Sequence, residues 1–137
     1  MDYQQLVQRY LDHPMHEGLT LTLSSNQGTS TLGITIHPGI CNLVGTLHGS
    51  YYFKCMDDAC FFAAISLKKH HFVATATFTH HYIKPASSGV LTAKAKVINQ
   101  QGSKYICDCM IYNDKDEQCA YGSGLFVAPK QTYNYKI

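Results

Sequence analysis

The 137-residue sequence lacks the features that would place it in several special classes of protein. No apolar run approaches the about 20 residues that a membrane-spanning helix needs, and the N-terminus has no charged-then-apolar signal pattern. Basic residues are scattered at a net charge of +2, so no stripe suited to nucleic acid is present, although a small anionic ligand is not excluded. We therefore expect a soluble, cytoplasmic protein with no nucleic-acid or membrane partner.

The six cysteines lack the CxxC spacing of a zinc knuckle. Cys55 and Cys60 lie in an apolar run, and Cys107 and Cys109 would point to one side of a strand. They therefore resemble small core residues. Since no secretion signal accompanies them, we expect reduced thiols rather than disulfides.

Neither the paired histidines nor the strand lysines require a binding site to explain them. The pairs His70–His71 and His80–His81 cannot each chelate a metal, because adjacent strand residues point to opposite faces, so we expect no metal and no cofactor. Four lysines could meet phosphates of a ligand, but solvated strand and turn residues are the simpler interpretation; they are Lys84, Lys94, Lys96 and Lys104.

The hydrophobic periodicity predicts an α+β fold. With 45% hydrophobic and 15% charged residues, the chain has the composition of one globular domain, spanning 1–137. Helical spacing predicts a short amphipathic helix over 2–12, and the last residues, 129–137, read as a loose tail. A segment without Gly or Pro, 50–68, is apolar on nearly every helical face, which predicts a central helix buried on most sides. Alternating patterns predict an antiparallel sheet wrapped around that helix, with strands at 19–23, 32–36, 72–82, 91–97, 104–112 and 119–128.

Two adjacent acids interrupt the apolar helix. Asp58 has Lys54 four residues before it, the spacing of an ion pair on a helix surface. Asp57 instead has Phe53 and Phe61 one turn away on either side. A carboxylate among phenylalanines loses hydration unless something compensates for it, so Asp57 is either solvated or used in a cleft.

The start of the same helix favours the second interpretation. Gly45 and Gly49 allow close approach to backbone N–H groups, and Ser50 is small, although it could simply be the N-cap. Unpaired donors and the partial positive charge at a helix N-terminus suit a developing oxyanion. A donor-rich helix end and a carboxylate two turns later form a plausible acyl-transfer site.

The stretch NLVGTLHGSYYFKCMDDA resembles the signature of hotdog-fold acyl-CoA thioesterases of the phenylacetyl-CoA-pathway type, within the hydroxybenzoyl-CoA thioesterase superfamily. That signature has an Asn, then a Gly-x-Leu-His-Gly-Gly turn, then an Asp nine residues after the His. The matching residues here are Asn42, Gly45, Leu47, His48, Gly49 and Asp57. Similarity continues through HHYIKPASSGVLTAKAKVINQQG and AYGSGLFVAP and covers roughly 18–128.

The resemblance implies a hotdog fold and an acyl-CoA substrate. It implies a homo-oligomer: a dimer built through a continuous sheet, commonly paired into a tetramer, with active sites at the dimer interface. Asp57 would be the general base or nucleophile, and the N–H of Gly49 would polarise the thioester carbonyl. Asn42 and the His48 region of the facing subunit would orient the carbonyl or water, and Thr75 would help to hold water.

Two departures from the signature affect these roles. Ser50 replaces the second Gly of the turn, and Asp58 stands beside Asp57, where a like charge can raise the pKa of a carboxylate. Two other functions remain open. One is a hydroxyacyl-thioester dehydratase, although the proline-rich turn that usually accompanies its His is absent. The other is a non-catalytic acyl-CoA-binding module.

Overall fold

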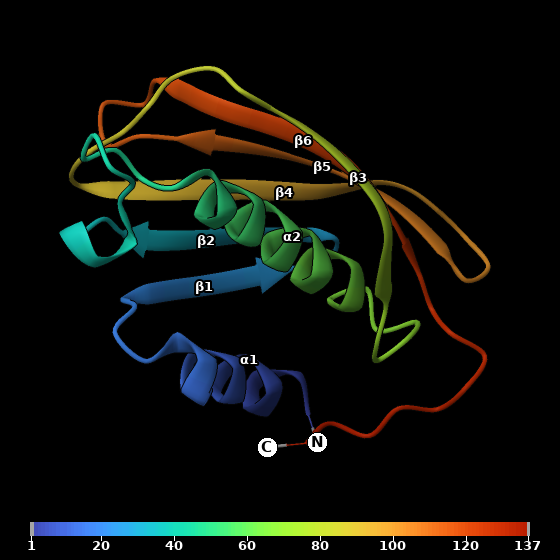
Figure 1. Ribbon diagram of the computed structural model, residues 1–137. Coiled ribbons are helices and arrows are strands. Elements are labelled where there is room, and N and C mark those ends of the chain that lie inside the picture. The colour runs from blue at the N-terminus through green and yellow to red at the C-terminus, as the bar shows by residue number, and fades with distance from the viewer. Residues whose placement is uncertain (1, 137) are drawn as a thin grey trace.

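The computed structural model describes residues 2–136 as one antiparallel sheet curved around a long helix (Figure 1). The predicted sequence of elements is confirmed: a short helix, two strands, the long helix and four strands. The helices are α1 (Tyr3–Leu11) and α2 (Gly49–Ile65), with short 3₁₀ turns at Pro14–His16 and Pro38–Ile40. The strands are β1 (Leu21–Asn26), β2 (Thr29–Thr35), β3 (Ala74–Tyr82), β4 (Val90–Gln101), β5 (Lys104–Tyr112) and β6 (Gln118–Val127).

Helix α2 forms the centre of the core. Its buried residues come from most of its circumference, as the all-round apolar pattern predicted, and they include Met56, Ala59 and Cys60 with no exposed surface. Along β5 and the first half of β4, buried residues that face this helix alternate with residues that are more exposed. No helix within residues 2–136 combines the length and apolar character needed to cross a bilayer.

The cysteines fill this core. All six are free thiols, and only Cys41 is not fully buried. Cys107 and Cys109 share the buried side of β5, as the alternation predicted. Burial raises the pKa of the Cys55 thiol, so this group stays protonated at neutral pH.

The sheet has the order β1-β2-β4-β5-β6-β3, which leaves β3 at one edge. The β1–β2 hairpin turns at Gln27 and Gly28, which both have positive φ, as a tight two-residue hairpin turn requires. At the other edge, β3 pairs only with β6 among the described strands. Most residues of β3 are exposed in the single chain.

The predicted tail has no helix or strand within residues 129–136, but its aromatic residues pack against the body of the protein. The rings of Tyr133 and Tyr135 lie 5.4 Å and 6.2 Å from that of Phe72, and the Tyr135 hydroxyl donates to the carbonyl of His71. The strand predicted at 72–82 begins two residues later, at Ala74, so the strand geometry used to exclude chelation by His70 and His71 does not apply to that pair. Phe72 is apolar and in phase with Ala74 and Ala76, so the pattern extends to it, although pairing with β6 begins only at Ala74.

Candidate active site

Asp57 lies on the side of α2 that faces β3. Its Oδ1 accepts a hydrogen bond of 2.7 Å from the hydroxyl of Thr75 near the start of that strand. The carboxylate is only half-buried and Thr75 is exposed, so the pair lies at the surface of the single chain beside its open sheet edge. Two of the candidate residues are therefore in direct contact.

A β-bulge in β3 makes this contact possible. The register with β6 shifts between Thr75 and Thr77. Phe78 also faces α2, because its ring packs 5.5 Å from that of Phe53. In a regular strand, residues three apart point to opposite faces. The inserted residue places both Thr75 and Phe78 toward the helix, which is how bulges commonly re-aim side chains at sites.

The surroundings raise the pKa of the Asp57 carboxyl above its usual range. Burial is the main cause, since it penalises the charged form. The hydrogen bond from Thr75 opposes this shift by stabilising the carboxylate, and the nearby negative charge of Asp58 adds to it. A carboxylate with a raised pKa binds a proton more readily, which suits a general base.

Asp58 faces away from this site toward α1. Its Oδ2 lies 2.8 Å from the Lys54 ammonium, which confirms the ion pair predicted from their spacing. The Tyr10 hydroxyl donates to the same oxygen at 2.5 Å. Burial and the neighbouring carboxylate raise the pKa of Tyr10, so it remains a donor. Asp58 thus fastens α1 to α2.

We expect Tyr10→Phe to lower the free energy of unfolding by about 1–3 kcal/mol, because it removes a hydrogen bond to a charged, partly buried carboxylate. Urea denaturation measures the change, and Tyr121→Phe on the exposed surface is the matched control. Equal stability of the two variants would contradict this role for Asp58.

The start of α2 is capped by His48. Its Nδ1 accepts from the backbone N–H of Ser50 at 3.1 Å, and the Ser50 hydroxyl lies 2.7 Å from the same nitrogen. The alternative of Ser50 as the N-cap is therefore wrong, since His48 occupies that position and Ser50 lies two residues into the helix. The His48 carbonyl accepts from Tyr51. As the first helical residue, Gly49 has no carbonyl within α2 for its own N–H.

A small pocket of about 280 Å³ opens beside Gly49. Tyr82, at the end of β3, forms part of its wall and donates to the Gly49 carbonyl at 2.9 Å. A Cβ at position 49 would lie 3.2 Å from the Tyr82 hydroxyl oxygen, so this position has little room for a side chain. The free amide and the pocket together form a site that a carbonyl oxygen could reach.

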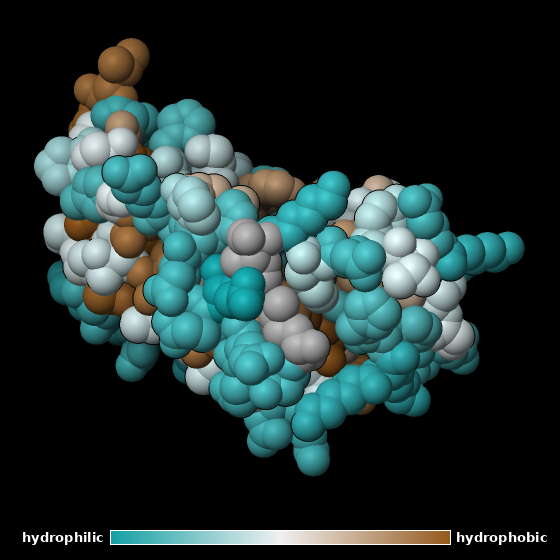
Figure 2. Space-filling view, turned by 90° about the horizontal axis from the view of Figure 1, so that it is seen from below, coloured by the Kyte–Doolittle hydropathy of each residue, from teal (hydrophilic) through white to brown (hydrophobic). Residues whose placement is uncertain are grey.

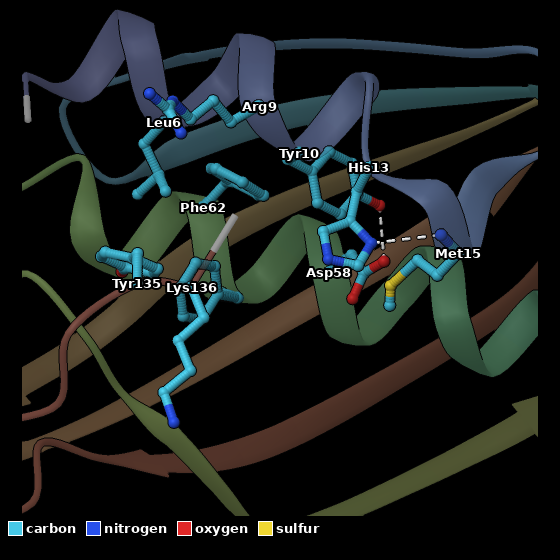
Figure 3. Close-up of a pocket in the computed structure, with 10 residues that line it drawn as sticks. Leu6, Arg9, Tyr10, His13, Met15, Asp58, Phe62, Tyr135 and Lys136 are labelled. Atoms are coloured by element: carbon cyan, nitrogen blue, oxygen red, sulfur yellow. Dashed lines mark hydrogen bonds between the residues drawn. The ribbon is translucent and has the colours of Figure 1, made fainter.

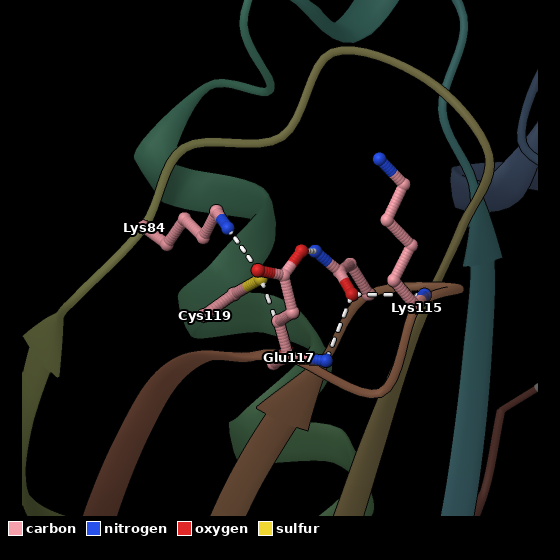
Figure 4. A network of polar contacts seen from close by, with 5 residues as sticks. Lys84, Lys115, Glu117 and Cys119 are labelled. Atoms are coloured by element: carbon pink, nitrogen blue, oxygen red, sulfur yellow. Dashed lines mark hydrogen bonds and ion pairs between the residues drawn. The ribbon is translucent and has the colours of Figure 1, made fainter.

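A polar network supports the far wall of this pocket. Lys84 lines the pocket and pairs with Glu117, which also accepts from the Asn113 amide (Figure 4). These contacts hold the segment after β3 against the β5–β6 turn. The hydrogen bond from Lys84 lowers the pKa of the Glu117 carboxyl. Lys84 is therefore a paired structural cation as well as a pocket residue.

Asn42 organises the loop that precedes α2. Its Oδ1 accepts from the backbone N–H groups of Val44 and Thr46, and its Nδ2 donates to the Thr46 hydroxyl at 2.8 Å. The fully exposed Leu43 and the largely exposed Val44 form the tip of this loop. The structure therefore shows Asn42 shaping the loop, and its predicted contact with substrate remains a prediction.

The candidate residues fall into separate groups within one chain. Asp57 contacts Thr75, whereas the N-cap His48 and Gly49 lie at the N-terminal end of α2, eight or more residues earlier. At 1.5 Å rise per residue, Asp57 and Gly49 are separated by about 12 Å along the helix axis. The pocket beside Gly49 does not include Asp57. One carbonyl group could not contact both within a single chain.

The sequence matches the family model of the thioesterase superfamily over residues 44–120, more than half of the chain. The chain belongs to the thioesterase superfamily. The matched region contains α2, β3 and four of the five candidate residues, and leaves Asn42 just outside. The expected hotdog fold and thioester hydrolase activity are thereby confirmed.

Three proteins to which this thioesterase is similar share low sequence identity with it. A protein of Saccharolobus solfataricus with a provisional esterase name is 26% identical over 106 residues, 77% of this chain and 71% of the relative. The E. coli PaaI protein from the phenylacetic acid degradation operon superposes with a TM-score of 0.84 at 21% identity, covering 95% and 94% of the two chains. A hypothetical thioesterase of Streptococcus pneumoniae, solved with coenzyme A, gives 0.74 at 20% identity, covering 79% and 87%.

Several residues around the site could not have been identified from local sequence patterns. Tyr82 contacts the carbonyl of Gly49, but in the sequence it is only the last aromatic of a strand. Tyr10 belongs to the apolar face of α1, and nothing in its spacing indicates a bond to Asp58. The bulge at Thr75 has no Gly or Pro to mark it.

Proposed function

We propose that this thioesterase hydrolyses acyl-CoA thioesters with Asp57 as the general base or nucleophile. The observation that carries the proposal is the half-buried Asp57 carboxylate, held by Thr75 on a helix whose first amide is free to receive an oxyanion. The coenzyme A bound to the streptococcal neighbour supports an acyl-CoA substrate.

The chemistry requires two groups on one thioester. As a base, Asp57 would remove a proton from water while the hydroxide adds to the carbonyl carbon. The N–H of Gly49 would donate to the carbonyl oxygen as it becomes negative, which is worth about 10²–10³ in rate. Collapse of the tetrahedral intermediate then breaks the carbon–sulfur bond, and the thiolate leaves and takes up a proton. In the alternative nucleophilic mechanism, Asp57 itself adds to the carbon, the carbon–sulfur bond breaks as the thiolate leaves and takes up a proton, and water then hydrolyses the resulting anhydride and regenerates the carboxylate.

We further propose that the two groups come from different copies of the chain. The helical separation of about 12 Å excludes their joint action within one copy. The edge of β3 is exposed and has no strand partner within residues 2–136, so it supplies a surface on which a second copy could extend the sheet.

The geometry of β3 fits this pairing. Thr75 near one end contacts Asp57, and Tyr82 at the other end contacts Gly49. If two β3 strands pair antiparallel about a two-fold axis near their middle, Thr75 of each comes opposite Tyr82 of the other. Asp57 of one copy would then approach Gly49 of its partner. A homodimer with two interfacial sites follows, and pairing of such dimers would give a tetramer.

The proposed function is tested by release of free thiol from acyl-CoA, followed as a function of pH. Because the carboxylate form acts, kcat/KM should fall about tenfold per pH unit below the pKa of Asp57. Since burial raises that pKa, the midpoint should lie above the ordinary value of 3.8.

Thr75→Val provides a comparison for the pH profile. It removes the hydrogen bond that favours the charged form, so the acidic limb should move to higher pH. If no acyl-CoA releases thiol, the proposed function is overturned. If the acidic limb of the pH profile has the same midpoint in Thr75→Val as in the native protein, Asp57 is not the base.

A further inference from the structure

A second pocket lies between α1, α2 and the C-terminal tail, away from the amide of Gly49. We name it the α1–α2 pocket. It has a volume of about 300 Å³, at the lower end of the range for small-ligand sites. Figure 3 shows Leu6, Tyr10, Phe62 and Tyr135 around it. Phe61 completes the aromatic part of the lining, and the other lining residues are Arg9, His13, Met15, Asp58 and Lys136. Neither the family signature nor the proposed chemistry uses these residues.

We propose that the α1–α2 pocket receives the distal part of the substrate's acyl chain, which makes the substrate class medium-chain or longer apolar acyl groups. This inference rests on the proposed function. In this proposal α1 and the tail select the length of the acyl chain, although they contribute nothing to the chemistry.

Phe61 connects the pocket with the reacting centre. It follows Asp57 by four residues, so it lies about one turn, or about 6 Å, further along the same side of α2. Its ring also packs 5.9 Å from that of Phe72, just before the strand that carries Thr75. A chain whose carbonyl is held at Asp57 therefore meets the edge of the pocket at Phe61.

Much of the pocket surface is apolar, and the acidic side chain that reaches it already has partners. Asp58 reaches it, but the Lys54 ammonium and the Tyr10 hydroxyl both contact that carboxylate. In Figure 3 the ammonium end of Lys136 extends away from Phe62. Seen from below, the surface is mostly hydrophilic, with hydrophobic atoms visible between the polar ones (Figure 2). Arg9 and Lys136 also line the pocket, but both are exposed, so their charges can stay in water while a hydrocarbon chain is covered between the aromatic rings.

The walls are fixed before any ligand arrives. Tyr10 bonds to Asp58, and the Tyr3 hydroxyl donates to the Phe62 carbonyl at 3.1 Å. A capping box at Asp2 and Gln5 fixes the start of α1. On the tail, Tyr135 is held by the His71 carbonyl and by Phe72. A preformed apolar pocket costs little reorganisation on binding.

The distance to the pocket predicts a threshold in chain length. An extended chain advances about 1.2 Å per bond, so about five bonds are needed to pass from Asp57 to Phe61. Butyryl-CoA should end before the pocket, whereas decanoyl-CoA should place several methylenes inside it. Each methylene that enters should raise kcat/KM by up to about fourfold.

Leu6→Trp tests this inference, because the larger side chain fills the pocket from α1. The ratio of kcat/KM for decanoyl-CoA to that for butyryl-CoA should fall at least tenfold. Gln8→Trp, on the exposed side of the same helix, is the matched control and should keep the native ratio. Leu6→Ala enlarges the pocket and should move the preference toward longer chains. A ratio within twofold of native in both Leu6 variants would overturn the proposal.

A fluorescence measurement separates this inference from the proposed function. The protein contains no tryptophan, and Met15→Trp places its only indole at the exposed rim of the pocket without filling it. Decanoyl-CoA should change the emission of this protein, whereas butyryl-CoA, and either ligand with Gln8→Trp, should not. If the native protein cleaves neither thioester, the proposed function fails, and the emission of the Met15→Trp protein alone then decides whether the pocket binds the chain.

Discussion

Replacing Asp57 by asparagine is expected to lower kcat for acyl-CoA hydrolysis by about 10²–10⁴, the contribution of a positioned general base. The loss would be at least as large if Asp57 is the nucleophile, because no covalent intermediate could form. Asparagine keeps the shape of the side chain and an oxygen that can accept from Thr75, so the fold and substrate binding should remain. Thiol release at saturating substrate measures the change, and Asp108→Asn on the exposed face of β5 is the matched control.

The same variant should be more stable than the native protein at neutral pH. Burial raises the pKa of Asp57 in the folded state, so folding favours its neutral form. This contribution to stability is fully present below the unfolded pKa and is lost as the pH rises through the folded one. Asparagine is neutral throughout, so Asp57→Asn should have a higher Tm at pH 7 and a matching Tm near pH 3. Native-like turnover, or a lower Tm at pH 7, would contradict the placement of Asp57 as a desolvated base.

Replacing Gly49 by proline should lower kcat/KM by about 10²–10³, because it removes the amide donor proposed for the oxyanion. The position tolerates proline: it is the first residue of α2, where proline is favoured. The preceding His48 has φ −63° and ψ 138°, the extended conformation that a following proline requires.

Gly49→Ala separates the effect of the donor from that of crowding. Both substitutions add a Cβ against the Tyr82 hydroxyl, but alanine retains the N–H. The difference in kcat/KM between the two variants therefore measures the amide itself. If alanine and proline reduce activity equally, the loss comes from crowding and Gly49 does not supply the donor.

Residue periodicity was sufficient to predict most of this fold. The absence of Gly and Pro from residues 50–68, and the strict alternation around Ala93 and Ala95, were enough to predict the elements and their order. The Lys54–Asp58 pair followed from its spacing alone, because that spacing sets a short distance on any helix.

Other features depend on contacts between distant parts of the chain. The bond from Tyr10 to Asp58 joins elements 48 residues apart, and local spacing has no bearing on it. The bulge at Thr75 is a property of its pairing with β6, so regular alternation put Thr75 and Phe78 on opposite faces. The aromatic tail packs on Phe72 through tertiary contacts that a polar, turn-rich sequence does not indicate.

Mixing two inactive variants tests most directly whether Asp57 of one copy acts with Gly49 of another. Asp57→Asn and Gly49→Pro would each be purified, dissociated together in equal amounts and allowed to reassociate, with native mass spectrometry verifying mixed dimers. A mixed dimer has one site with both defects and one with neither, so random reassociation should restore about a quarter of the native activity. If mixed dimers form and thiol release stays at the level of the separate variants, the two residues do not serve a shared site across the interface.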